Sequence, residues 1–104
     1  MNKEKFFFIE ARKLVSKLIF KVLTKNLCVR EALKSFPKNI KDPSVQCAWH
    51  ALIHYEADED HRNASLEYTK EQDDYIEMLA FILQEGEKIP INIINSYREY
   101  YKID

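Results

Sequence analysis

The chain has 104 residues, of which 46% are hydrophobic and 32% charged, and this composition is typical of one globular domain rather than a disordered segment. A single glycine, Gly86, argues against both hairpin-rich sheets and glycine-rich phosphate-binding loops. Charge is segregated, with +5 on residues 1–25 and −7 on residues 56–77, and an acidic body of this kind excludes nucleic acid as an expected partner. We therefore expect one all-α domain over residues 1–104.

The first expected helix covers residues 3–24. Lysines form a narrow polar stripe along it, and Phe20 widens the apolar arc on the other side. So broad an apolar arc predicts a central bundle helix or a helix that packs against a second chain. The residues expected to face inward are Phe7, Ala11, Leu14, Val15, Leu18, Ile19 and Val22.

A short helix is expected at residues 29–36, where Pro37 ends it. Asp42 followed by Pro43 then predicts an N-cap and the first turn of a third helix, which runs to about residue 58. The expected core stripe of this helix consists of Val45, Trp49, Leu52 and Ile53.

Residues 61–68 are expected to form a polar linker. Residues 69–72 have the pattern of a capping box and predict a fourth helix to residue 85, which Gly86 ends. Pro90 predicts the start of a last helix, to about residue 101, with Ile94 and Tyr97 facing inward. The sequence thus predicts a compact bundle of four main helices plus one short helix, up-and-down-like where the loops are short.

One candidate metal site lies on the third expected helix and just beyond it. His50 and His54 are four residues apart, so both can bind one divalent transition metal such as zinc. If the helix continues to residue 61, Asp58 and His61 share their face, and Glu77 could supply a ligand from the next helix. The alternative is a solvent-exposed polar flank, because HxxxH without a fixed third ligand recurs by chance.

Two further groups have both a structural and a catalytic interpretation. Glu56 lies on the apolar side of the third expected helix, so we expect a hydrogen bond from Tyr75, Tyr97 or a lysine; the catalytic alternative is a general base. Cys47 could pair with His50 as thiolate and base, but the middle of a helix offers no free backbone N–H for an oxyanion hole. This setting favours a structural thiol.

The candidate partner surface consists of Phe81, Met78 and Phe20. Phe81 projects opposite the inward stripe of the fourth expected helix, and an exposed aromatic side chain can mark a contact with another protein. The leading interpretation is a non-enzymatic helical module, without a cofactor, that acts through a protein partner or self-association. The alternative is a metal-binding bundle.

Membrane association is not expected. The apolar run at residues 6–9 is too short for a signal peptide, and charged residues follow it at once. No uncharged stretch approaches the roughly 20 residues of a spanning helix. Two cysteines without a CxxC motif predict reduced thiols and a cytoplasmic location.

Overall fold

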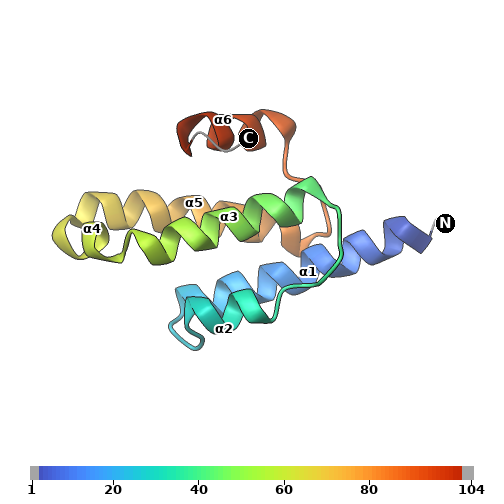
Figure 1. The fold of residues 1–104 in the computed structure, drawn as a ribbon, viewed down its shortest axis with the longest axis horizontal. Helices are drawn as coiled ribbons and strands as arrows, with labels where there is room; N and C mark the ends of the chain where they lie inside the picture. Colours follow the sequence, from blue (N-terminus) through green and yellow to red (C-terminus); the bar gives the residue numbers. More distant parts are fainter. Residues whose placement is uncertain (1–2, 102–104) are drawn as a thin grey trace.

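The structure, a computed structural model, describes residues 3–101, with side chains described for residues 5–99. The helices are α1 (Lys3–Leu23), α2 (Val29–Lys34), α3 (Pro43–Ala57), α4 (Glu59–Ala64), α5 (Leu66–Gln84) and α6 (Ile91–Tyr101). No strand occurs among the described residues, and the predicted all-α class is confirmed (Figure 1). The four main predicted helices are α1, α3, α5 and α6.

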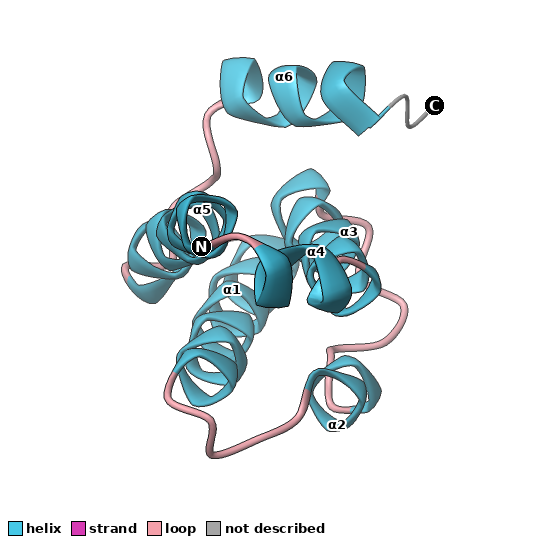
Figure 2. Cartoon of the chain, turned by 90° about the vertical axis from the view of Figure 1, so that its left-hand side faces the viewer, coloured by secondary structure: helices cyan, strands magenta, loops and turns pink. Residues whose placement is uncertain are grey.

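Helices α1, α3 and α5 form the body of the molecule, and α6 lies across one side of it (Figure 2). α5 runs antiparallel to α1 and α3, which share one direction because α2 and residues 35–42 lead the chain back to the same end (Figure 1). α2 packs against α1 and α3, and α4 joins α3 to α5. Among the described helices, none is long and apolar enough to span a membrane.

The centre of the core lies between α1 and α5. Val15, Ile19 and Leu79 are fully buried there. Ser16 and Ala80 are small and let the two helices approach closely, and the Ser16 hydroxyl donates a hydrogen bond of 2.7 Å to the Ala80 carbonyl. This contact satisfies the hydroxyl inside the core, where an unpaired polar group would be costly.

The buried face of α1 is rotated from the predicted one. Phe7 and Leu14, predicted to face inward, are 58% and 41% exposed. Arg12 and Ser16, on the opposite flank, are buried in their place, because each finds hydrogen-bond partners inside the protein. Periodicity alone ranks a phenylalanine above an arginine as a core residue, so the inward assignment of Phe7 and Leu14 was wrong.

The predicted stripe of α3 needs a similar correction. Val45 and Leu52 are buried as predicted, but Trp49 and Ile53 are 37% and 38% exposed. Small residues, including Cys47, fill the inner face of α3 and allow it to pack closely on α1 and α5. Trp49 lies at the edge of this contact. Its ring packs edge-to-face against that of Phe36, just after α2, with the two ring centroids 5.3 Å apart.

The predicted helix ends are partly confirmed. Asp42 caps α3 by accepting a hydrogen bond from the Ser44 amide, and Gly86 follows α5 with a φ of 75°. α5, however, begins before the predicted capping box, because Ser65 accepts from the Tyr68 amide and serves as its N-cap. The Thr69 hydroxyl instead donates to backbone carbonyls of the preceding turn. The prediction of a polar linker at residues 61–68 was therefore wrong, because this segment is helical except at Ser65.

A buried ion pair joins three segments that are far apart in the sequence. Arg12 Nε and Nη2 donate to the two carboxylate oxygens of Asp42, at 2.7 and 3.2 Å. A third nitrogen, Nη1, donates to the Gly86 carbonyl at 3.0 Å. Ser44 continues the network by accepting from the Ile89 amide at 2.8 Å. The α5–α6 connection is thus attached to α1 and to the start of α3, which sets where α6 begins.

Candidate functional site

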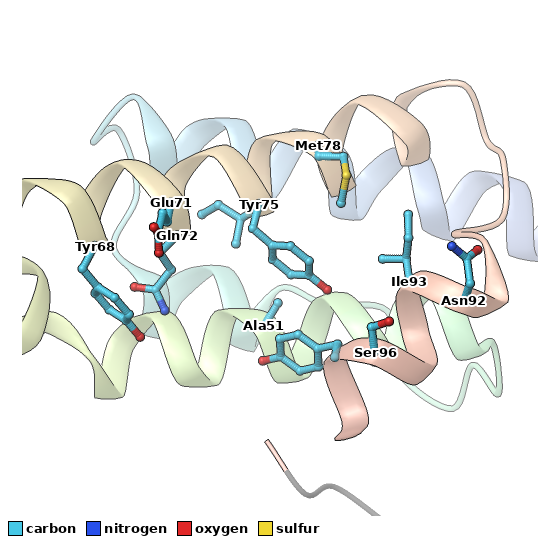
Figure 3. Close-up of a pocket in the computed structure, with 11 residues that line it drawn as sticks. Ala51, Tyr68, Glu71, Gln72, Tyr75, Met78, Asn92, Ile93 and Ser96 are labelled. Atoms are coloured by element: carbon cyan, nitrogen blue, oxygen red, sulfur yellow. The ribbon is translucent and has the colours of Figure 1, made fainter. Parts of the chain in front are cut away.

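A groove of about 440 Å³ opens between α5 and α6, with α3 at its base (Figure 3). The groove exists because α6 packs on α3 and stands away from α5. Among the described residues, no Cα atom of α6 lies within 8 Å of a Cα atom of α5. We call this feature the α5–α6 groove. Its lining residues are Ala51, Tyr68, Glu71, Gln72, Tyr75, Ile76, Met78, Asn92, Ile93, Ser96 and Tyr97.

Tyr97 connects α6 to both neighbouring helices. It is buried together with Ile94, and its hydroxyl lies 2.5 Å from Nδ1 of His54 on α3. Its ring also stacks on that of Tyr75 on α5, with the centroids 5.5 Å apart and an interplanar angle of 11°. This stack spans the distance between the two backbones and forms an aromatic floor for the groove.

The groove follows α5 for nearly three turns. Tyr68 and Gln72 lie at one end, Tyr75 in the middle, and Met78 and Ile93 at the other end (Figure 3). Ten residues of helix separate Tyr68 from Met78, which corresponds to about 15 Å. The groove lining includes three tyrosines and Met78, and these aromatic and thioether side chains suit an apolar ligand of extended shape.

The outer face of α5 beside the groove is acidic. Glu71 lines the groove, and the exposed Glu67 and Asp74 lie next to it on the same side of α5. Glu77 and Lys70 are also exposed, but they lie farther round the helix, on the side of Phe81. No ion pair within 4 Å involves any of these residues in the described part of the chain. A like-charged stripe of this kind raises the local concentration of cationic groups.

Asp73, the remaining carboxylate of this stretch, is already engaged. It accepts a hydrogen bond of 2.8 Å from the Tyr55 hydroxyl. Burial, and then this bond to the carboxylate, raise the pKa of Tyr55 to about 12. The pair is therefore a structural contact between α3 and α5 and does not contribute to the exposed charge.

The residues predicted to bind metal are dispersed by the break between α3 and α4. α3 ends at Ala57, so His61 does not continue the face of His50 and His54. The His61 ring stacks on Tyr68, with the centroids 3.8 Å apart. Within residues 5–99, no group of three or more His, Cys, Asp or Glu side chains is arranged to hold a metal ion.

The other predicted ligands have different contacts. Asp58 accepts hydrogen bonds from the Tyr68 hydroxyl at 2.6 Å and from Gln72 at 3.2 Å, which join α4 to the start of α5. Glu77 lies on the exposed face of α5. His50 is partly buried beside α6; this burial, and then the nearby charge of His54, lower its pKa. Each side chain thus has a packing or surface role in the structure.

Glu56 and Cys47 both have contacts within the fold. Glu56 is hydrogen-bonded as predicted, but its partner is Arg30 of α2, at 2.6 Å, rather than a tyrosine or a lysine. Cys47 is buried, and desolvation raises the pKa of its thiol, which keeps it protonated near neutral pH. Its Sγ lies 4.0 Å from the Tyr75 hydroxyl.

The two cysteines are therefore expected to differ in reactivity. Cys28 is exposed and should react rapidly with a thiol reagent in the native protein, whereas Cys47 should react only when the core opens. Titration with a chromogenic disulfide should report one fast thiol in the native state and two after denaturation. The Cys28→Ser variant should lose the fast phase. Rapid native labelling of Cys47 in that variant would contradict its burial beneath α6.

The predicted partner surface is divided in the structure. Phe81 is exposed on α5 but packs edge-to-face on Phe20 of α1, with the ring centroids 5.2 Å apart. Met78 lies on the side of α5 that faces α6 and lines the groove. The sequence did not point to Tyr68 or Ile93 as groove residues. A usable signal was the seven-residue spacing of Tyr68 and Tyr75, which places both on one side of a helix.

Comparison with known proteins finds no family model that matches this sequence, no similar curated protein and no similar solved structure.

Proposed function

We propose that this chain is a non-enzymatic interaction module whose α5–α6 groove binds a basic amphipathic helix of another protein. The observation that carries the proposal is the apolar groove itself, with Glu71 in its lining and Glu67 and Asp74 beside it, none of which forms an ion pair among the described side chains. An amphipathic helix fits such a groove with side chains spaced by three, four and seven residues, and basic residues at its edges fit the acidic stripe.

The lining chemistry supports a helix rather than a small polar ligand. Tyr68, Tyr75 and Met78 present large surfaces with few polar atoms, and methionine adapts to ligands of varied shape. The polar groups on the α6 side, Asn92 and Ser96, are uncharged. Specificity would therefore come from the α5 carboxylates and from apolar side chains that reach the aromatic floor.

Cysteine usage supports a cytoplasmic site of action. Cys28 and Cys47 are both free, as expected for a reducing compartment. The raised pKa of Cys47 also supports a packing role for that thiol rather than a nucleophilic one.

Methyl NMR of methionine offers a direct test. The chain has two methionines, Met1 and Met78, so a sample labelled at the methionine methyl carbon gives two resonances, and Met78→Leu assigns one of them. A designed amphipathic helical peptide with lysines beside its leucine stripe should shift the Met78 resonance in a saturable way. A matched peptide with glutamates in place of the lysines should bind at least about tenfold more weakly.

Charge reversal provides the control. Glu67→Lys combined with Glu71→Lys should weaken the lysine peptide at least about tenfold, whereas Glu59→Lys combined with Asp60→Lys on α4 should change binding by less than about threefold. Equal binding of both peptides, or an unchanged Met78 resonance at saturation, would refute the proposal.

A further inference from the structure

One face of α1 is exposed and carries both apolar side chains and lysines. Phe6, Phe7 and Leu14 are exposed there, and Glu10, Lys13 and Lys17 lie on the same side of the helix, so this side has a net charge of +1. We call these six residues the α1 outer face. The first turns of α1 extend past the ends of α3 and α5 (Figure 1). Leu14 and Lys17 lie farther along the helix, beside Gln84 of α5, and are exposed there.

The lysines of this face have no ionic partner within the chain. In the part that the structure describes, no ion pair joins Lys13 or Lys17 to a carboxylate. Among the described side chains, no ion pair joins residues 1–25 to residues 56–77; Arg12 pairs with Asp42 and Glu56 with Arg30 instead. Both charged surfaces remain available to another molecule.

The α1 outer face matches the α5–α6 groove in length as well as charge. Phe7 and Leu14 are seven residues apart, so they lie on one side of α1 and about 10 Å apart along its axis. This separation fits within the groove, which follows α5 for about 15 Å. Lys13 and Lys17 would then lie close to Glu71 and to the acidic stripe that borders the groove.

We infer that the partner of the groove is a second copy of this chain, which docks its α1 outer face between α5 and α6. This inference rests on the proposed function of the groove. The contact is head-to-tail, because each copy contributes a different surface. A two-fold contact of α1 with α1 would bring lysines together, and a contact of groove with groove would bring carboxylates together, so both are disfavoured by repulsion.

Two charge-reversed variants test this arrangement. Variant one carries Lys13→Glu and Lys17→Glu, and variant two carries Glu67→Lys and Glu71→Lys. All four positions are exposed, so both variants should fold normally. In sedimentation velocity over a concentration series, the wild type should associate, and each variant alone should associate at least about tenfold more weakly.

Mixing the two variants should restore association, because every contact between unlike copies again joins opposite charges. Variant two distinguishes the head-to-tail contact from an α1-to-α1 dimer, since its α1 outer face is unchanged and such a dimer would survive. The matched control, Lys34→Glu with Lys38→Glu at the end of α2 and just beyond it, should associate like the wild type.

Three outcomes would overturn the inference: a wild type that stays monomeric at every concentration, a variant two that associates normally, or a mixture that does not recover. The peptide experiment separates these from failure of the groove itself. If the lysine peptide shifts the Met78 methyl resonance while the protein stays monomeric, the groove binds basic helices but does not bind α1 of a second copy.

Discussion

Replacement of Arg12 by methionine is expected to lower the free energy of unfolding by about 3–5 kcal/mol. Methionine fills much of the same space, but it leaves the buried Asp42 carboxylate without its cationic partner and the Gly86 carbonyl without a donor. Removing one member of a buried pair exposes the other to the full cost of an uncompensated charge. Chemical denaturation followed by far-UV circular dichroism measures the loss.

Three companion variants separate charge from geometry. Arg12→Lys keeps the charge but cannot donate two parallel hydrogen bonds to Asp42, so an intermediate loss is expected. Asp42→Asn in the Arg12→Met background removes the unpaired charge and should recover part of the stability. Lys21→Met, an exposed change on the same helix, should stay within about 0.5 kcal/mol of the wild type. A similarly small loss for Arg12→Met would contradict the buried network.

The same pair shows where sequence reasoning about the fold stops. Helix propensity, Pro43 and Gly86 predict where elements begin and end, because those signals act over a few residues. The side on which α1 is buried depends on Asp42, thirty positions away, which gives Arg12 a partner inside the core. Periodicity assigns each side chain to the core or the surface by its own polarity, without information about distant partners. The sequence therefore predicted that Phe7 is buried and Arg12 is not.

The candidate site was predictable only in part. Met78 and the inward placement of Tyr97 follow from local spacing, and both belong to the α5–α6 groove. The groove itself depends on how far α6 stands from α5, which is set by the anchored connection and by the stack of Tyr75 on Tyr97. The histidine pattern was misleading for a different reason: the helix break at residue 58 separates His61 from the face of His54.

Gly86 should be the second most sensitive position, and Gly86→Ala is expected to cost about 2–4 kcal/mol. Its φ of 75° is readily adopted by glycine but is strained for alanine. A Cβ atom placed there would lie 2.8 Å from Cγ2 of Ile9, so the α5–α6 connection or α1 would have to shift. Because the Gly86 carbonyl also accepts from Arg12, such a shift would strain the buried network.

A double-mutant cycle with Ile9→Ala isolates the steric part. Removing the Ile9 side chain should cost less in the Gly86→Ala background than in the wild type, by at least about 1 kcal/mol, because the clash disappears with it. Asn39→Ala, at an exposed position with a φ of 61°, reports the conformational cost alone and should lose about 1 kcal/mol or less. Additive losses in the cycle would mean that α1 does not approach Gly86. The attachment of the α5–α6 connection to α1, and with it the spacing that opens the groove, would then need another explanation.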